Sequence, residues 1–378
     1  MMMKRVFFDN AATTPLLDEV IQAMEETMRH NNGNPSSIHA EGRKARAAIE
    51  QARKQIAKQI GASIGEIFFT SGGTESNNMA LKCAVRDLGV QRIISAATEH
   101  HCVLHSLDAL AQDRGTEVVF VHLKSSGQPD LLHLEQLLQQ SDQKTLVSLM
   151  HANNEIGVMI DLDAVSALCA QYGAYFHSDT VQTIGYFPID VSQTNISFLS
   201  GSAHKLHGPK GVGFIYINSN NLIQPYIDGG AQERNMRGGT ENLYGIIGVA
   251  KAVEIGSANQ ENWRVHITSL RDYLRAQLQA HFPEALINGN PDEGHYKLLS
   301  ASFPPSSKSD MLLFNLDIAG ISVSGGSACS SGSNVGSHVI AALEAHPQDY
   351  TTIRFSLSHL NTKEEVDVVI EKLKTCLI

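Results

Sequence analysis

Lys205 is placed where a carbonyl-binding lysine would be expected. It lies between His204 and His207 in SGSAHKLHGPKGVG, directly after the apolar and β-branched run VSQTNISFLS. Such a run predicts a strand, so Lys205 is expected just past a strand end. A lysine attacks a carbonyl only as the neutral amine, which desolvation or a nearby cation favours. The alternative is a solvated loop lysine without a chemical role.

Asp179 is a second candidate, because it follows the predicted strand AYFHS. Ligands of open parallel sheets bind at the carboxyl ends of strands. A carboxylate there can keep a ring nitrogen protonated and so turn a pyridine into an electron sink. Gln182 comes three residues later and would face the same way on a turn or helix. Asp179 could equally serve only as a helix N-cap.

Three more polar groups follow predicted strands. The segment Ser71–Thr74, SGGT, joins a strand to a helix, where backbone N–H groups and the helix N-terminus favour a phosphate. A tight turn explains that pattern equally well. His100 and His101 follow RIISAAT, and a flat imidazole could stack on a ring. Asn154 follows TLVSLM, although asparagines after strands are often only turn formers.

The five cysteines form an odd set without a CxxC motif, which argues against a disulfide framework or a zinc knuckle. Cys329 lies in the small-residue patch SVSGGSACSSGSNVGS, which predicts a mobile loop with an exposed thiol. The alternative is a linker thiol without a function. The other cysteines lie in apolar helical contexts and are expected in the core: Cys83, Cys102, Cys169 and Cys376.

Arg354 and two pairs of histidines form further patterns that could bind a ligand. Arg354 lies in the strand-like TTIRFS, and a guanidinium there could clamp an α-carboxylate or form a surface ion pair. His101 and His105 have the spacing of metal ligands, as do His204 and His207. No carboxylate or thiolate pattern accompanies them, so no metal site is predicted.

The elements that must position these residues alternate along the chain. Amphipathic helices separate apolar runs that predict strands at residues 66–70, 92–96, 118–122, 146–150, 174–177, 196–199 and 212–217. This alternation is typical of an α/β fold with a mostly parallel sheet covered on both faces. It places the chemistry at the carboxyl edge of that sheet.

The remainder predicts a smaller α+β domain. The chain is expected to be helical from Tyr244 to about Leu278. Strands follow near residues 301–303 and 352–356, with helices near 311–316, 335–345 and 362–374. We place a large domain at residues 15–255. The smaller one comprises residues 1–14 and 256–378 and carries the Cys329 loop.

Composition excludes several classes of protein. The net charge of -10 argues against nucleic-acid binding, which needs a basic face. No apolar run approaches the roughly 20 residues that span a bilayer. The first residues, MMMKRVFFDN, lack the apolar region of a signal peptide. With 42% hydrophobic residues and 378 in all, the chain has ample material for a large core. We expect a cytoplasmic protein.

Over nearly its whole length the chain resembles the NifS/IscS-type cysteine desulfurases, which are class V aminotransferases with fold type I of the pyridoxal-phosphate enzymes. The matching stretches are DNAATTP, GNPSSIH, FTSGGTESNN, TEH, HANNEIG, HSDTVQ, SGSAHKLHGPKGVG, RGGTEN, SGGSACSSGS and IRFSLS. The resemblance implies a fold type I large domain with a seven-stranded sheet. It also implies conversion of L-cysteine to L-alanine with pyridoxal 5'-phosphate as the cofactor.

The resemblance also implies a role for each matching residue. Lys205 would form the internal aldimine, and Cys329 would be the nucleophile that takes the sulfur as a persulfide. His100 would stack on the ring and give or take a proton at the sulfur. The other cofactor contacts would be Gly73, Thr74, Ser202, His204 and Thr240 of the partner subunit for the phosphate, Asp179 for the ring nitrogen, and Gln182 for the ring hydroxyl. Asn154 would contact the cofactor and, with Arg354, the substrate carboxylate.

The implied partners are a second copy of the chain, in a homodimer, and an iron–sulfur scaffold or another sulfur acceptor. No resident metal is implied, and Cys329 would be at most a transient ligand of an iron–sulfur cluster. Three departures leave the acceptor open: no proline after Cys329, Ser358-His359 where a glycine and a basic residue are usual, and Gly238 for a common serine. The alternatives are a selenocysteine lyase, another aminotransferase of this fold, or a non-catalytic docking protein.

Overall fold

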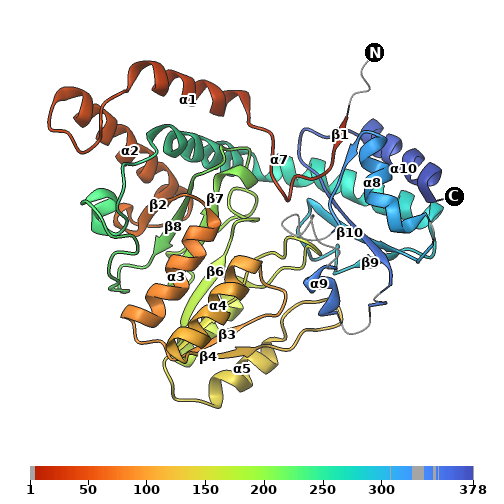
Figure 1. Ribbon diagram of the computed structural model, residues 1–378, viewed down its shortest axis with the longest axis horizontal. Helices are drawn as coiled ribbons and strands as arrows, with labels where there is room; N and C mark the ends of the chain where they lie inside the picture. The colour runs from red at the N-terminus through yellow and green to blue at the C-terminus, as the bar shows by residue number, and fades with distance from the viewer. Residues whose placement is uncertain (1–4, 307, 326–335, 344–345, 348, 378) are drawn as a thin grey trace.

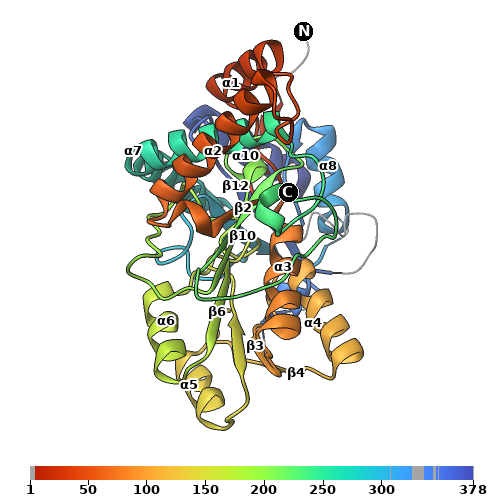
Figure 2. The same ribbon diagram turned by 90° about the vertical axis from the view of Figure 1, so that its left-hand side faces the viewer.

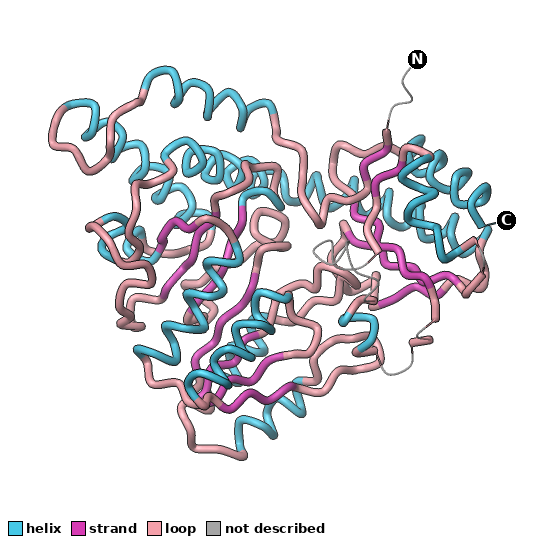
Figure 3. The backbone as a smooth tube through the Cα atoms, in the orientation of Figure 1, coloured by secondary structure: helices cyan, strands magenta, loops and turns pink. Residues whose placement is uncertain are grey.

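The computed structural model describes residues 5–306, 308–325, 336–343, 346–347 and 349–377. Its largest unit is a seven-stranded sheet, whose arrangement can be followed in Figures 1 and 3. The strand order is β2-β8-β7-β6-β5-β3-β4. β8 is antiparallel to both of its neighbours, and the other pairs are parallel. The sheet therefore confirms the predicted α/β class. Its strands are β2 (Ile67–Thr70), β3 (Arg92–Ser95), β4 (Glu117–Phe120), β5 (Thr145–Ser148), β6 (Tyr175–Asp179), β7 (Phe198–Ser202) and β8 (Gly213–Ile217).

Alternate residues of these strands face two different helical layers. In β2, Phe68 packs in one apolar cluster, whereas Ile67 and Phe69 pack in the other. This is the period of two that a pleated strand imposes. One layer consists of α3 (Gly73–Asp87) and α4 (His101–Arg114). Figure 2 shows α5 and α6 on the opposite side, and the second layer comprises α2 (Ala40–Gln59), α5 (Leu131–Gln139) and α6 (Leu162–Gln171).

The second unit is built on a small antiparallel sheet. Its order is β12-β10-β9, and β1 pairs separately with β11 in parallel. These strands are β1 (Val6–Phe7), β9 (Leu286–Asn288), β10 (Leu298–Phe303), β11 (Ile321–Ser322) and β12 (Thr351–Ser356). The accompanying helices are α8 (Leu312–Ile318), α9 (His338–Ala341) and α10 (Lys363–Leu377). Sequence analysis missed β1, β9 and β11, because two or three residues carry no readable period.

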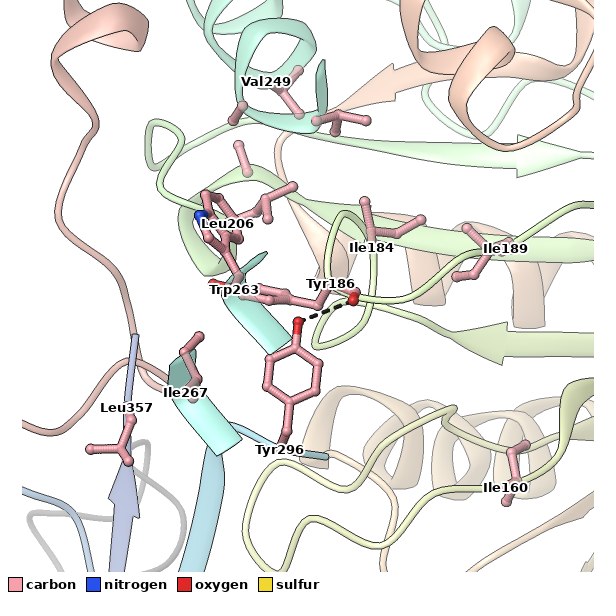
Figure 4. Packing of buried hydrophobic residues seen from close by; sticks show 14 of the residues in the cluster. Ile160, Ile184, Tyr186, Ile189, Leu206, Val249, Trp263, Ile267, Tyr296 and Leu357 are labelled. Carbon is pink, nitrogen blue, oxygen red and sulfur yellow. Dashed lines mark hydrogen bonds between the residues drawn. The ribbon is translucent and has the colours of Figure 1, made fainter. Parts of the chain in front are cut away.

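A long helix connects the two units. α7 (Leu243–His281) spans 39 residues and packs against α2, α1 (Asp18–His30), α10 and β10. It crosses position 255, so the domain boundary predicted there lies inside one continuous helix. The division into two domains remains a prediction. Figure 4 shows one place where the core is continuous: Tyr296 donates its hydroxyl to the carbonyl of Tyr186 at 3.0 Å, beside Trp263.

None of the helices in the described ranges combines the length and the apolar character that a membrane crossing requires.

Candidate active site

The predicted chemical groups meet at the carboxyl edge of the large sheet. Asp179 is the last residue of β6, and Ser202 is the last residue of β7. Lys205 follows immediately, at the end of the short 3₁₀ helix Ala203–Lys205. Because parallel strands end on the same side, these side chains come together although they are distant in sequence.

A single cavity of about 230 Å³ collects most of the predicted site. It is lined by Gly73, Thr74, His100, Asn154, Asp179, Gln182, Ser202, His204, Lys205 and Arg354. Thr240 lines a different cavity, together with Arg237 and Glu241. Its predicted contact from a second subunit therefore stays a prediction. Cys329 lies outside the described residues.

The Lys205 amine is held by the N-terminal segment. Its Nζ donates to the carbonyl oxygens of Ala11 and Ala12, each at 2.7 Å. Its own carbonyl accepts from the Tyr186 hydroxyl at 3.3 Å. Lys205 is only half-buried, yet its side chain reaches across the cavity to residues 194 and 193 positions away. Sequence analysis missed the roles of Ala11 and Ala12, and their place in DNAATTP was the only available signal.

The Asp179 carboxylate is fixed on both of its oxygens. Oδ1 accepts from the backbone N–H of Val181 at 2.9 Å, and Oδ2 accepts from Nδ2 of Asn77 at 2.6 Å. Asp179 therefore makes the turn contact expected of a capping residue and also lines the cavity. Gln182 donates to the Ala11 carbonyl at 3.1 Å, while its buried Oε1 has no partner among the described residues. Buried oxygens are usually paired, so this one is available to a donor from a molecule bound in the cavity.

The start of α3 forms a cradle for an anion. Gly72 caps the helix at a φ of 150°, a conformation that favours glycine. A Cβ added to Gly73 would lie 2.6 Å from Cγ2 of Val181, so this position has no room for a side chain. Ser202 and His204 complete the cradle. Burial, and secondarily the charge of Lys205, lower the pKa of His204 to about 4, so its ring is neutral at physiological pH.

His100 is the N-cap of α4. Its Nδ1 accepts from the backbone N–H of Cys102 at 3.1 Å and lies 3.1 Å from the Cys102 sulfur. Burial lowers the pKa of His100; the Asp179 carboxylate opposes this shift, and Lys205 adds to it. Cys102, predicted to be a core residue, packs against the apolar cluster of α3 and α4 but is not fully buried. The first turn of α4 brings it into the cavity wall, half-buried, beside His100.

Arg354 belongs to β12 and closes the cavity from the second unit. It is 2% exposed, donating through Nη1 to the Asn154 carbonyl at 2.8 Å and through Nη2 to Asp9 at 2.9 Å. The alternative of a surface ion pair is therefore wrong, because the pair with Asp9 is largely buried. Sequence analysis missed Asp9, which opens the stretch DNAATTP.

These groups suit one kind of ligand pair. An amine and an anion cradle can hold a phosphorylated aldehyde, and the Asp179 carboxylate can pair with a protonated ring nitrogen. A buried guanidinium a short way off can hold the carboxylate of an amino acid. The free Oε1 of Gln182 is placed to accept from a ring hydroxyl. The residues of the cavity thus fit the predicted cofactor.

The chain is similar over nearly its whole length to a known family of proteins. The profile of the aminotransferase class-V family matches residues 6–369. A protein named cysteine desulfurase IscS from Dictyoglomus turgidum is 41% identical over 99% of this chain and 96% of its own length. Cysteine desulfurase NifS from Azotobacter vinelandii is 38% identical over 98% and 92%. A solved structure described as a NifS-like protein is 36% identical, covers 99% of both chains and has a TM-score of 0.91.

Proposed function

Because the chain belongs to the aminotransferase class-V family, we propose that it is a pyridoxal-phosphate-dependent cysteine desulfurase, which converts L-cysteine to L-alanine and passes on the sulfur. The observation that carries this proposal is the cavity that joins the Lys205 amine, the Asp179 carboxylate and the Arg354 guanidinium. Full-length similarity to proteins named cysteine desulfurase supports the choice of substrate.

The cofactor would be held at both of its ends. Gly73, Thr74, Ser202 and His204 would bind the phosphate, and Asp179 would keep the ring nitrogen protonated. The neutral ring of His100 would stack on the cofactor, and Gln182 would meet its hydroxyl. Lys205 would carry the cofactor covalently through Nζ. Bound pyridoxal phosphate supplies an electron sink that makes the α-proton of an attached amino acid removable.

The chain's own residues bind the substrate and move its proton. Arg354 would hold the α-carboxylate, with Asn154 beside it. The Lys205 amine lines the same cavity, where its Nζ would be placed to take the α-proton of a bound amino acid. The carbonyls of Ala11 and Ala12 give that amine a resting position in the cavity wall. Positioning of this kind replaces the random encounter of base and substrate.

The sulfur would leave on Cys329. Its thiolate attacks the sulfur of the bound cysteine, an S–S bond forms as the C–S bond breaks, and protonation of the remaining carbon yields alanine. A persulfide stays on Cys329 and is then handed to an acceptor. We propose an iron–sulfur scaffold or a similar protein as that acceptor, a cytoplasmic location, and a homodimer in which Thr240 of the partner subunit completes each phosphate site.

The test compares the wild type with Cys329→Ser, and uses Cys376→Ser as the matched control. We expect the wild type to release alanine and sulfide from cysteine, with visible absorbance from bound cofactor. Cys329→Ser should lose sulfide release and keep the absorbance, because the proposed cofactor contacts do not include Cys329. Cys376→Ser, at the end of α10, should behave like the wild type.

Other outcomes would favour the alternatives. An aminotransferase has no use for Cys329, so unchanged activity in Cys329→Ser would contradict the proposal. A strong preference for selenocysteine in direct competition would identify a selenocysteine lyase. A colourless protein that gains no absorbance with added pyridoxal phosphate would indicate a docking protein instead of an enzyme.

A further inference from the structure

Cys102 contacts the His100 ring through both its backbone and its side chain. Its N–H donates to Nδ1 of His100 at 3.1 Å, and its sulfur lies 3.1 Å from the same nitrogen. A backbone N–H can only donate, so Nδ1 must present its lone pair. In a neutral imidazole the proton is then on Nε2.

The contacts of Asn77 with the Cys102 sulfur determine which atom donates in the hydrogen bond between Cys102 and His100. Asn77 donates through Nδ2 to Oδ2 of Asp179 at 2.6 Å and to the Cys102 sulfur at 3.2 Å. The carboxylate accepts only, which fixes the orientation of the Asn77 amide. Its Oδ1 then faces Nε2 of His177 at 3.2 Å, as a donor–acceptor pair requires. The Thr74 side chain also hydrogen-bonds the sulfur, and its hydroxyl can donate. A sulfur that accepts from Asn77 and Thr74 has its S–H left to donate to Nδ1 of His100.

We propose that Cys102 is a positioning residue, which holds His100 as the neutral tautomer with its proton on Nε2. Any ring-nitrogen contact between His100 and a molecule in the cavity is then made by an N–H donor. His100 therefore gives a hydrogen bond to the reacting group and does not act as a base, since a base would need a bare Nε2. This consequence for catalysis rests on the proposed function, whereas the tautomer itself does not.

The surroundings of the pair agree with this assignment. Burial disfavours the charged ring and lowers the pKa of His100. The Asp179 carboxylate opposes this shift, whereas the charges of Lys205, His338 and His105 add to it. Burial, followed by the Asp179 charge, raises the pKa of Cys102 to about 12. Cys102 therefore remains a protonated thiol that can donate. It is also a poor nucleophile, which separates its role from that of Cys329.

The test is nitrogen NMR of the full chain, labelled with ¹⁵N-histidine and purified with its cofactor bound but free of cysteine. His100→Gln identifies the His100 signals among those of the 17 histidines. We expect an unprotonated Nδ1 and a protonated Nε2 at neutral pH. Cys102→Ala, which removes one donor, should raise the titration midpoint of His100 by about half a unit to one unit. Cys102→Ser retains a donor and should restore the wild-type midpoint.

Cys83→Ala is the matched control, because it removes a buried thiol whose sulfur contacts Arg86 and not an imidazole. It should leave the His100 titration unchanged. A wild-type ring protonated on Nδ1 would overturn the proposal. So would a Cys102→Ala midpoint equal to that of the wild type, or a shift in Cys102→Ser or Cys83→Ala as large as that in Cys102→Ala. The NMR readout needs no turnover, so failure of desulfuration and failure of this assignment are distinguishable.

Discussion

The Nζ of Lys297 lies 4.3 Å from the ring centre of Tyr186, whose hydroxyl donates to the backbone of Lys205. Lys297 is 0% exposed, and its Nζ has no hydrogen-bond partner in the part of the chain that the structure describes. Burial, and then the charges of Lys205 and Arg354, hold the pKa of Lys297 well below its usual value. The folded protein therefore binds this proton much more weakly than the unfolded chain does.

Replacing this amine should stabilise the protein. Lys297→Met removes an unsatisfied buried donor, and we expect the free energy of unfolding at pH 7 to rise by about 1–3 kcal/mol. The unfolded lysine keeps its proton up to a pKa of about 10.4, so the wild type gains stability as the pH rises toward that value. The advantage of the variant should therefore shrink at pH 9.

Urea unfolding of cofactor-free protein at pH 7 and pH 9 measures the stability difference between Lys297→Met and the wild type. Lys210→Met, at an exposed position, should change little, and a destabilised Lys297→Met would contradict the prediction.

Arg354→Lys should weaken substrate binding. Lysine cannot reproduce the planar fork that spans Asp9 and Asn154, so the charge-assisted grip on a carboxylate is lost. We expect kcat/KM for cysteine to fall about 10- to 100-fold, mainly through KM, because such a bond contributes about 1.5–3 kcal/mol. Alanine formation at varied cysteine concentrations measures the change. Arg264→Lys, an exposed pair with Glu261, serves as the control, and an unchanged KM in Arg354→Lys would rule out the proposed grip.

Arg53→Met should destabilise the fold. Arg53 donates to both carboxylate oxygens of Glu233, at 2.7 and 3.0 Å, and both side chains are nearly inaccessible. The variant leaves Glu233 buried without its counter-charge, which typically costs about 3–5 kcal/mol. Urea unfolding gives the value. Arg264→Met breaks an exposed pair that solvent screens and should leave the free energy of unfolding nearly unchanged. Similar losses of unfolding free energy in Arg53→Met and Arg264→Met would show that the buried pair contributes no more to stability than the exposed one.

His177 should make the protein sensitive to acid. Burial lowers the pKa of His177 to about 3, while the unfolded residue titrates near 6.5. Between these values the unfolded chain binds the extra proton, so stability is lost as the pH falls through this window. This group alone contributes a slope approaching about 1.4 kcal/mol per pH unit.

Unfolding free energies between pH 7 and pH 4.5 test that slope. His177→Gln removes the titrating ring and should give a shallower dependence on pH than the wild type. His281→Gln, at the exposed end of α7, is the control and should keep the wild-type slope. Equal slopes for the wild type and His177→Gln would contradict the assignment of a buried neutral imidazole.

Local sequence patterns were sufficient to predict the large sheet and most of the residues that line the cavity. The strand before Asp179 and the strand before Lys205 have a strong apolar signal, and parallel strands must end at a common edge. The contacts that sequence analysis missed join distant segments, such as Asp9 with Arg354 across 345 positions. No local period encodes such a pairing. Cys102 was missed for a different reason: its apolar helical context resembles that of a core residue, and only the tertiary position of α4 exposes it to the cavity.

The resting place of Lys205 depends on the last strand of the chain. The N–H groups of Asn10 and Ala11 donate to Ser356, at 3.2 and 2.8 Å, and so anchor the segment that accepts from the lysine. During translation the N-terminal part leaves the ribosome first, yet its anchor is made only after residues 351–356 have been added. A nascent chain interrupted before that point lacks the Ser356 contacts that anchor the segment over Lys205. The contacts that hold the Lys205 amine can therefore reach their native arrangement only after residues 351–356 have been synthesised.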